Sequence, residues 1–368
     1  MDNPYLLLTP GPLSTSNGVR NSMLQDWCTW DDDYNKDIVS YVRNTLCELI
    51  ENNGSNEYTS VLLQGSGTFA VESVIGSCIK PNGHLLVISN GAYGDRIAQI
   101  SKVLGISFDL LQFKEYEQPS IPKIEEQLKA KKYSHVIMVH CETTTGILNN
   151  IQDVAKLSKA YSSRFIVDAM SSFGGIPIDL KTLDIDCLIS SANKCIQGVP
   201  GFGFVLIKKE LIEGCKGIAR SLSLDLYAQW KEMEDKGGKW RFTSPTHVVR
   251  AFKTALEELK EEGGIEARYQ RYKENQSILV EGMQALGFEP LVKREWQSPF
   301  ITSFLFPKRE NFEFNTFYHS LKKKGFVIYP GKISDAETFR IGSIGHVFPE
   351  DFKRLLAAVE EVELAASN

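Results

Sequence analysis

The sequence lacks the features that mark several specialised classes of protein. Its seven cysteines are odd in number, and none belongs to a Cys-x-x-Cys pair. Disulfide-rich secreted domains and zinc ribbons depend on such patterns, so we expect reduced thiols in a cytoplasmic protein. No apolar run approaches the ~18 residues of a membrane span. The first residues also lack the basic and apolar regions of a secretory signal.

Positive charge is not in excess either. The chain has 41 Lys and Arg against 46 Asp and Glu, a formal net charge of −5. Such a balance gives no general attraction to nucleic acid, although it allows a local basic site. The six histidines form no His-Glu-x-x-His motif, and no Gly-x-Ser-x-Gly stretch occurs. We therefore expect neither a metal enzyme nor a serine hydrolase of that type.

What the chain does contain is an alternation of short apolar runs with amphipathic stretches of helical length. The expected strands are residues 61–64, 85–88, 108–111, 136–139, 165–167, 187–189 and 204–207. The expected helices among them are residues 69–78, 93–104, 121–131 and 151–161. Continuous apolar strands separated by helices are typical of a parallel sheet covered on both faces. This predicts a large α/β domain over residues 16–260.

The pattern changes after about Gly214. Two polar helical stretches, 245–262 and 266–286, flank Gly263-Gly264. The remaining expected elements are strands 300–306, 326–329 and 338–341 and helices 314–324 and 350–362. This order suits a smaller α+β domain over residues 261–368, with residues 1–15 as an N-terminal segment.

A glycine-rich turn, Gln64-Gly-Ser-Gly-Thr-Phe-Ala70, lies between an expected strand and an expected helix. The N–H groups at a helix start, with the hydroxyls of Ser66 and Thr68, can cradle a phosphate. The turn also matches Gly-x-Gly-x-x-Ala, but Ser89-Asn-Gly91 stands where a dinucleotide site needs an acidic residue. A nicotinamide dehydrogenase is therefore disfavoured. A plain turn with Thr68 near a helix cap is the alternative.

Two further polar residues follow apolar strands. Asp168 would lie at the carboxyl edge of the sheet, as a metal ligand, a general base or the partner of a protonated ring nitrogen. A helix cap or a buried salt bridge is the alternative for Asp168. Lys194 follows a strand and precedes the glycine-rich residues 198–203. Most lysines are solvated, but one held among small, uncharged residues can act as an imine-forming amine.

Together these three features are the parts that hold pyridoxal phosphate. The turn at residues 66–68 would bind the phosphate. Asp168 would keep the ring nitrogen protonated, so that the ring accepts electrons. Lys194 would form the Schiff base.

The sequence resembles the fold-type I pyridoxal-phosphate aminotransferases of the alanine–glyoxylate and serine–pyruvate group over nearly its whole length. The stretches that carry the resemblance are Leu8–Pro12, Leu63–Thr68, His140–Gly146, Val167–Phe173, Ser191–Gly203, Lys239–Thr246, Tyr329–Lys332 and Phe339–Gly342. Asn193–Gly201 and Trp240–Thr246 resemble the branch that acts on 2-aminoethylphosphonate and pyruvate. The resemblance implies a mainly parallel seven-stranded sheet in the large domain, pyridoxal 5'-phosphate as cofactor, and a homodimer with sites at the subunit interface.

The resemblance also implies roles for single residues. The implied cofactor contacts are Ser66, Gly67 and Thr68 with the phosphate, Tyr93 with the ring face, Thr143 near the ring hydroxyl, Asp168 with the ring nitrogen, Lys194 in the Schiff base, and Thr243 with the phosphate bound by the neighbouring subunit. Many relatives have Trp at the position of Tyr93. Arg340 would bind the substrate anion, with Gly11 and Pro12 closing that side.

Arg340 also fits this chemistry on physical grounds. A guanidinium binds a carboxylate or a phosphonate through two parallel hydrogen bonds, and the expected enzyme must hold both anions in turn. A surface salt bridge is the alternative for Arg340. The expected reaction is a ping-pong transamination in which Lys194 serves as nucleophile and general acid/base.

Other activities remain to be separated from this one. An alanine–glyoxylate or serine–pyruvate aminotransferase differs by few residues, in the donor pocket. A cysteine desulfurase shares the fold, but Cys195 is expected to pack rather than react. A catalytically silent scaffold is disfavoured by the Asp168–Lys194 pair. The expected partners are small-molecule substrates, with no nucleic acid, membrane or metal, and the charged runs Asp31–Asp33 and Lys322–Lys324 are expected to be solvated.

Overall fold

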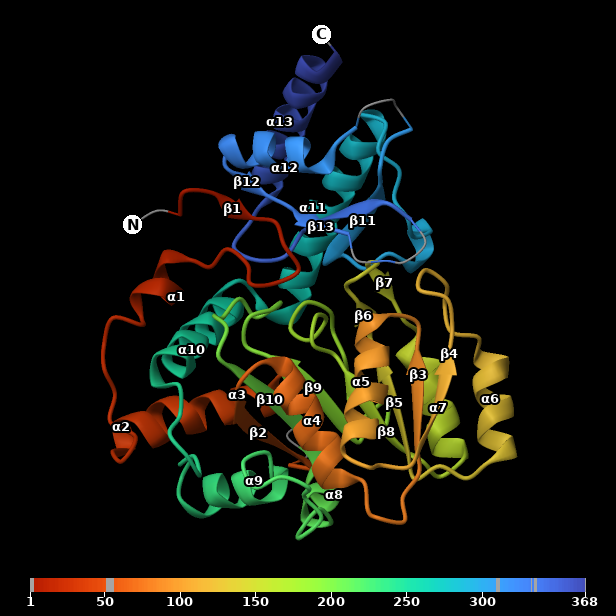
Figure 1. The fold of residues 1–368 in the computed structure, drawn as a ribbon. Helices are drawn as coiled ribbons and strands as arrows, with labels where there is room; N and C mark the ends of the chain where they lie inside the picture. Colours follow the sequence, from red (N-terminus) through yellow and green to blue (C-terminus); the bar gives the residue numbers. More distant parts are fainter. Residues whose placement is uncertain (1–2, 51–55, 309–311, 332, 334–335, 368) are drawn as a thin grey trace.

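A seven-stranded mixed sheet organises the first two thirds of the chain in the computed structural model, which describes residues 3–50, 56–308, 312–331, 333 and 336–367 (Figure 1). The strands, in the order in which they lie side by side, are β2 (Tyr58–Gln64), β10 (Phe202–Lys208), β9 (Cys187–Ser191), β8 (Arg164–Asp168), β5 (His135–Val139), β3 (Leu85–Ser89) and β4 (Phe108–Gln112). The pairs from β9 to β4 are parallel, and β10 is antiparallel to both its neighbours. The expected α/β class with a mainly parallel sheet is confirmed.

Helices cover both faces of this sheet. The helices of one face are α4 (Gly67–Cys78), α5 (Ala92–Val103), α8 (Lys209–Glu213) and α9 (Leu226–Asp235), and those of the other are α3 (Tyr41–Glu48), α6 (Ile121–Ala130), α7 (Ile151–Ala160) and α10 (Thr246–Glu261). Neighbouring residues of one strand therefore face different cores. Leu62 packs in one hydrophobic cluster and Leu63 in the other. Burial on both faces explains why these strands are apolar without alternation.

A three-stranded antiparallel sheet forms the centre of the C-terminal part. Its strands are β11 (Ile301–Leu305), β14 (Thr338–Gly342) and β13 (Tyr329–Pro330), in that order. The surrounding helices are α11 (Gly264–Ala285), α12 (Phe314–Lys323) and α13 (Pro349–Ser367). They pack around a cluster of aromatic rings that includes Phe304 and Phe339, whose centroids lie 5.7 Å apart. Figure 1 shows these helices above the large sheet.

The expectation of a single strand at residues 326–329 is wrong. The chain forms two short strands there, β12 (Phe326–Val327) and β13, which belong to different sheets. The N-terminal strand β1 (Leu6–Leu7) pairs in parallel with β12, through hydrogen bonds from Leu6 N to Gly325 O and from Leu8 N to Val327 O. Because this partner lies more than 300 residues away in sequence, the local pattern could not indicate the change of sheet.

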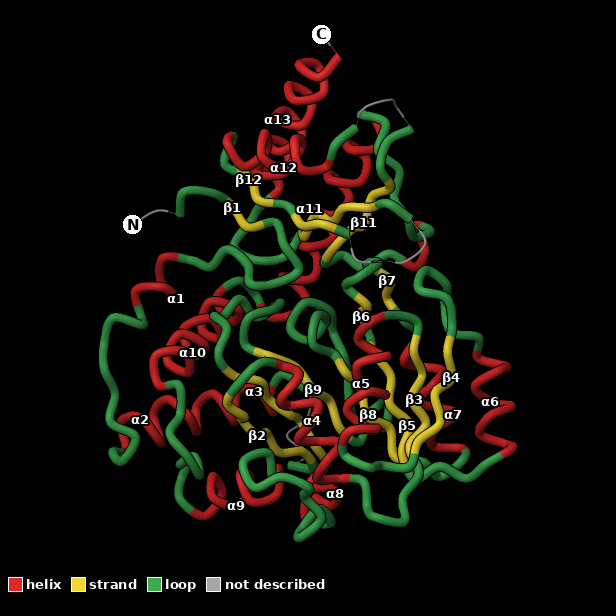
Figure 2. Tube along the Cα trace, in the orientation of Figure 1, coloured by secondary structure: helices red, strands yellow, loops and turns green. Residues whose placement is uncertain are grey.

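Several short elements were not expected from the sequence (Figure 2). They are α1 (Asn17–Asn21), α2 (Asp32–Tyr34), η1 (Asn35–Ser40), β6 (Cys141–Glu142), β7 (Ile147–Leu148) and η2 (Arg294–Trp296), along with α3, α8 and α9. The expected break between two long helices is confirmed at Gly263 and Gly264, whose φ angles are +107° and +81°. The division of the chain into domains at residue 260 stays a prediction.

Two further expectations concern membranes and metals. Within the described parts of the chain, no helix has the combined length and apolar character that crossing a membrane requires. The same residues contain no cluster of three or more His, Cys, Asp and Glu side chains able to hold a metal ion.

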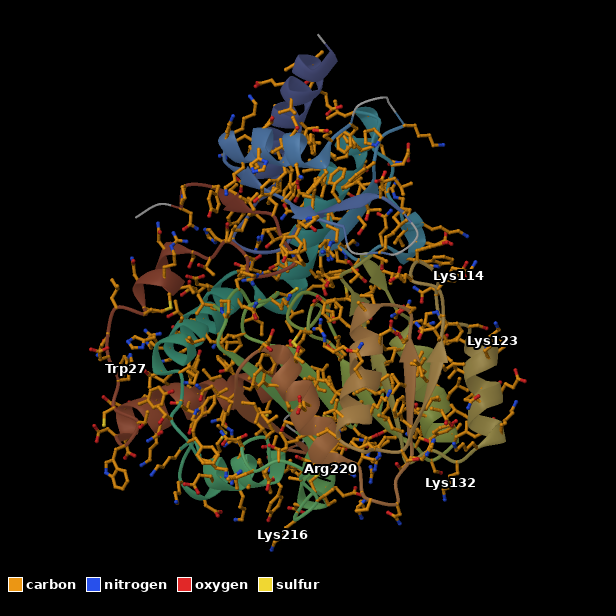
Figure 3. The ribbon with its side chains drawn as sticks, viewed as in Figure 1. Trp27, Lys114, Lys123, Lys132, Lys216 and Arg220 are labelled. Atoms are coloured by element: carbon orange, nitrogen blue, oxygen red, sulfur yellow. The ribbon has the colours of Figure 1, made fainter. Side chains whose placement is uncertain are left out.

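The labelled lysines Lys114, Lys123, Lys132 and Lys216 lie apart from one another along the edge of the molecule (Figure 3).

Candidate active site

Loops from the carboxyl ends of the large sheet's strands meet in a cavity of about 180 Å³. Six of the residues predicted to contact the cofactor line it: Ser66, Gly67, Thr68, Tyr93, Asp168 and Lys194. They come from the starts of α4 and α5, the end of β8 and the loop after β9. The structure thus brings together residues that are up to 128 positions apart, at the sheet edge where open α/β folds bind ligands.

The start of α4 forms one wall of the cavity. Ser66 is the N-cap residue, and its side chain makes no capping hydrogen bond. Thr68 is the second residue of the helix and so lies near this cap, as the alternative expected; its hydroxyl accepts a hydrogen bond of 3.4 Å from Nη1 of Arg96. A Cβ atom on Gly67 would come 2.2 Å from Sδ of Met170, so a side chain at this position would force the flexible Met170 side chain to move. Exposed N–H groups, two hydroxyls and a guanidinium together form a site suited to a phosphate.

Asp168 is the last residue of β8 and is almost fully buried. Burial raises the pKa of its carboxyl to about 6, while the hydrogen bond from Met170 N, at 2.9 Å, and the charges of Lys194 and Arg96 act in the opposite direction. No salt bridge to Asp168 occurs among the described residues. The alternative of a buried salt bridge is therefore wrong, and the carboxylate can pair with a cationic group in the cavity.

Lys194 reaches the cavity from the loop after β9. Its Nζ donates a hydrogen bond of 2.8 Å to the carbonyl of Pro10. Burial lowers the pKa of its ammonium group. Gly11 has a φ of +129°, and a Cβ atom there would lie 2.8 Å from the same Nζ. The N-terminal segment therefore covers the amine, and it can do so only with glycine at this position.

Cys195 is buried beside this lysine. Its thiol donates to the carbonyl of Ser171 at 3.2 Å, and burial raises its pKa. A reactive cysteine needs a lowered pKa and access to substrate. The side chain thus packs, as expected, and offers no nucleophile.

Arg340 lies on β14, beside the cavity but not on its wall, and is 3% exposed. Its Nε donates to the carbonyl of Pro330 at 3.0 Å and its Nη1 to the carbonyl of Thr143 at 2.8 Å. The ring of Tyr329 lies 5.0 Å from its Cζ. The alternative of a surface salt bridge is wrong, because the guanidinium is buried and has no carboxylate partner among the described residues. Lys332, in the same expected stretch, lies outside the described residues.

Three further predicted residues, like Arg340 and Gly11, are not among those that line the cavity. The hydroxyl of Thr143 is buried and has no hydrogen-bond partner among the described residues, while its carbonyl accepts from Arg340. The carbonyl of Pro12 accepts a hydrogen bond from Thr9 Oγ1. Thr243 lies in a separate cavity of about 400 Å³, with Gly65, Phe69 and Phe242. Thr243 is therefore not part of the site built by its own chain.

Sequence reasoning missed four residues at this site. Arg96, Met170 and Asn193 line the cavity. Glu142 is fully buried behind Tyr93 and accepts a hydrogen bond from Gly94 N at 2.9 Å. All four had a usable signal. Arg96 follows Tyr93 by one helical turn, and Glu142, Met170 and Asn193 lie inside stretches that carry the resemblance.

A family model decides the assignment of the chain. The model described as aminotransferase class-V matches residues 32–338. This chain belongs to the class-V aminotransferases. The matched residues include the phosphate-binding turn at residues 66–68, Asp168 and Lys194.

Curated relatives are similar over almost the whole chain. A 2-aminoethylphosphonate–pyruvate transaminase of Phocaeicola vulgatus is 58% identical over 98% of this chain and 99% of its own. One of Vibrio vulnificus is 59% identical over 98% of both. A bifunctional phosphonoacetaldehyde hydrolase/aminoethylphosphonate transaminase of Clostridioides difficile is 58% identical over 98% of this chain but 56% of its own. The aminotransferase therefore belongs to the family of the 2-aminoethylphosphonate–pyruvate transaminases.

Solved structures agree with this assignment at the level of the fold. The ureidoglycine–glyoxylate aminotransferase of Bacillus subtilis superposes with a TM-score of 0.91 at 22% identity, over 100% of this chain and 95% of its own. The pyridoxamine–pyruvate aminotransferase of Mesorhizobium loti gives 0.90 at 22% identity, over 100% and 94%. The aminotransferase thus has the expected fold-type I architecture.

Proposed function

We propose that this aminotransferase moves the amino group of 2-aminoethylphosphonate to pyruvate, giving phosphonoacetaldehyde and L-alanine, with pyridoxal 5'-phosphate as cofactor. The observation that carries the proposal is the meeting of a phosphate cradle, Asp168 and Lys194 in one cavity. The choice of substrates follows the printed names of relatives that are 58–60% identical over 98% of the chain.

Two features of the chain fit this cofactor. The cradle at residues 66–68 has no side chain at Gly67, where a Cβ atom would meet Met170. The buried hydroxyl of Thr143 has no partner in the described part of the chain, which suits a contact with a polar group of a bound ring. When bound, pyridoxal phosphate supplies an electron-accepting ring and an aldehyde that reacts with amines.

Lys194 is the nucleophile and the general acid/base in this proposal. Its lowered pKa raises the fraction of free amine at neutral pH, and only a free amine can attack a carbonyl or accept a proton from carbon. The Pro10 carbonyl holds Nζ without adding a negative charge, which would favour the ammonium form. Lys194 would thus take the proton from the amine-bearing carbon of the substrate and deliver it to the carbon on the other side of the transferred nitrogen.

Asp168 supplies the negative charge that keeps the ring nitrogen protonated. Its carboxylate is buried, so its attraction for a cation is weakly screened by water. Burial raises its pKa to about 6, and a cationic partner lowers the pKa of a carboxyl group. Binding of the ring therefore stabilises the charged form that the reaction needs.

Arg340 binds the acidic end of both substrates in turn. Its Nε and Nη1 atoms are held by main-chain carbonyls, which fix the plane of the guanidinium without neutralising it. Donor groups of the guanidinium beyond these two bonds can meet a phosphonate or a carboxylate. Gly11 and Pro12 would close this side of the site.

We also propose a homodimer with Thr243 reaching the cofactor phosphate of the partner. Apolar side chains are exposed around the cavity that contains Thr243: Phe69 at 49% and Phe242 at 52%. An apolar patch on the surface is typical of a protein interface. The proposal includes a cytoplasmic location, because the seven cysteines follow no disulfide pattern in the sequence.

The test compares alanine formed from pyruvate, with 2-aminoethylphosphonate or serine as donor, with glycine formed from glyoxylate, with alanine as donor. We expect 2-aminoethylphosphonate to give a higher kcat/KM than serine, or than alanine with glyoxylate as acceptor. Faster turnover with either of those would replace the donor assignment. A protein that takes up no pyridoxal phosphate, measured by its visible absorbance before and after borohydride reduction, would overturn the cofactor as well.

A further inference from the structure

Glu142 is a buried acid to which the proposed reaction gives no role. It ends the two-residue strand β6 and is 0% exposed. No Lys, Arg or His of the described residues forms an ion pair with it. Its Oε1 accepts from Gly94 N at 2.9 Å, and its Oε2 lies 3.4 Å from both Tyr93 N and Thr144 Oγ1. The carboxylate therefore binds mainly the first N–H groups of α5.

Helix α5 has no N-terminal cap of its own. Gly91 occupies the N-cap position and has no side chain to accept from the helix. Unpaired N–H groups at a buried helix start are costly, and an acid there also interacts favourably with the helix dipole. Glu142 thus provides, from a different element, the cap that an Asp or Ser at Gly91 would normally provide.

The first turn of α5 is clamped from two sides. A Cβ atom on Gly91 would lie 2.8 Å from Cδ of Glu142, and one on Gly94 would lie 2.5 Å from Oγ of Ser89. Tyr93 lies between these two glycines and lines the cavity. Its ring also packs against the guanidinium of Arg96, 5.0 Å from the ring centroid. The main chain that carries the ring is consequently fixed by Glu142 on one side and by Ser89 on the other.

We propose that Glu142 is a positioning residue that caps α5 and thereby fixes the ring of Tyr93 over the cofactor site. This inference rests on the proposed function, because the partner of the Tyr93 ring is the bound cofactor. Glu142 is not among the residues that line the cavity, so it would act through Tyr93 rather than on substrate or cofactor directly.

The environment of Glu142 makes its capping of α5 depend on pH. Burial raises the pKa of its carboxyl to about 7, against the hydrogen bonds from Gly94 and Tyr93. The charged groups that face it are Asp168 on β8 and Asp95 on α5, and both act to raise the pKa. The charged cap therefore forms as the pH rises through about 7, and we expect the Tyr93 ring to be held best above that pH.

The test is a double-mutant cycle on cofactor affinity. The variants are E142A, E142Q, Y93A and E142A/Y93A, and the readout is the dissociation constant for pyridoxal phosphate, from quenching of protein fluorescence. Loss of a helix cap of this kind corresponds to about a tenfold weaker affinity for E142A. In the Y93A background the same change should have an effect of less than about twofold, because the residue it positions is gone.

E142Q separates a charge effect from a merely structural one. Glutamine keeps an acceptor oxygen but cannot become charged. We expect the wild-type affinity to increase between pH 6 and pH 8 by a larger factor than the affinity of E142Q. Equal pH profiles, or an E142A effect that is the same with and without Tyr93, would overturn the inference.

E234Q is the matched control for general loss of stability. Glu234 is a part-buried acid that accepts from Arg43 and Thr59, away from the cavity. The E234Q substitution should lower the melting temperature of the protein without changing its affinity for the cofactor. If the wild-type protein binds no pyridoxal phosphate, the proposed function fails. If the wild type binds and E142A binds equally well, only the inference about Glu142 fails.

Discussion

Nζ of Lys194 donates a hydrogen bond of 2.8 Å to the carbonyl of Pro10, 184 residues earlier in the chain. The N-terminal segment is anchored on the C-terminal part by pairing of β1 with β12, and Gly342 leaves no space for a Cβ atom against the main chain of Thr9. The amine of Lys194, on the loop after β9 of the large sheet, is thus held by an N-terminal segment that is itself fixed to the C-terminal part. This contact joins the three parts of the chain at the site.

Lys194→Ala should abolish transamination. The amine is the nucleophile and the proton carrier, and general acid–base catalysis alone is worth about 10²–10⁴-fold. We expect a fall of at least about 10³-fold in kcat, measured as alanine formed, and loss of the borohydride-sensitive visible absorbance.

Lys194→Arg is the matched control. It keeps a positive charge and similar length, but its guanidinium does not lose its proton at neutral pH. It should be as inactive as Lys194→Ala. Substantial activity in either variant would contradict the role of this amine.

Asp168→Asn should make the cofactor-free protein more stable above pH 6. The folded-state pKa of Asp168 is about 6, against an ordinary value of 3.8, so the native state binds a proton more tightly than the unfolded state does. The wild type therefore loses stability as the pH rises from about 4 to about 6, by about 3 kcal/mol at most. Asparagine does not titrate and avoids this loss.

Urea unfolding of both proteins at pH 4 and pH 8 measures the difference. The advantage of the variant should be present at pH 8 and small at pH 4, while its transaminase activity is lost at both. If the difference in the free energy of unfolding between the two proteins were the same at pH 4 and pH 8, burial would not raise the pKa of Asp168. The prediction also separates stability from function, since the acid that destabilises the fold is the one the reaction uses.

The elements that the sequence predicted best are those whose pattern is local. The seven strands of the large sheet are continuous apolar runs, and Asp168 and Lys194 follow directly on two of them, so their place at one edge could be foreseen. The change of sheet at Ile328 depends on β1, and the cap of α5 depends on Glu142 from β6. Such contacts join distant segments and leave no periodic signal in either one.

Gly67→Ala should weaken cofactor binding more than it destabilises the fold. The new methyl group would overlap Sδ of Met170, a flexible side chain that can move only at the expense of the cavity. Overpacking of this kind costs about 1–3 kcal/mol, or about 5–150-fold in affinity. The measurement is the dissociation constant for pyridoxal phosphate.

The double variant Gly67→Ala/Met170→Ala tests the mechanism of that loss. Removing the Met170 side chain should recover most of the affinity, because the overlap is relieved. If it recovers none, the loss arises from the main chain of the cradle and not from this contact.

Arg340→Lys should raise KM for both substrates. Lysine has no planar fork, so it cannot donate to the carbonyls of Pro330 and Thr143 and also bind an anion through two parallel bonds. We expect KM to rise about tenfold or more for 2-aminoethylphosphonate and for pyruvate, in steady-state kinetics with the other substrate saturating. A rise for one substrate alone would show that the two anions bind at different groups.

Phe242→Asp should dissociate the proposed dimer. Phe242 is 52% exposed beside the cavity that contains Thr243 and Phe69, and an unpaired charge placed in an apolar interface costs several kcal/mol. Light scattering should give twice the chain mass for the wild type and the single-chain mass for the variant. Leu364→Asp is the control, because Leu364 is 61% exposed on α13, outside this patch, and the same charge there should leave the dimer intact. Since Thr243 would serve the partner's phosphate, dissociation should also weaken cofactor binding, and a Phe242→Asp variant that remains dimeric would place the interface elsewhere.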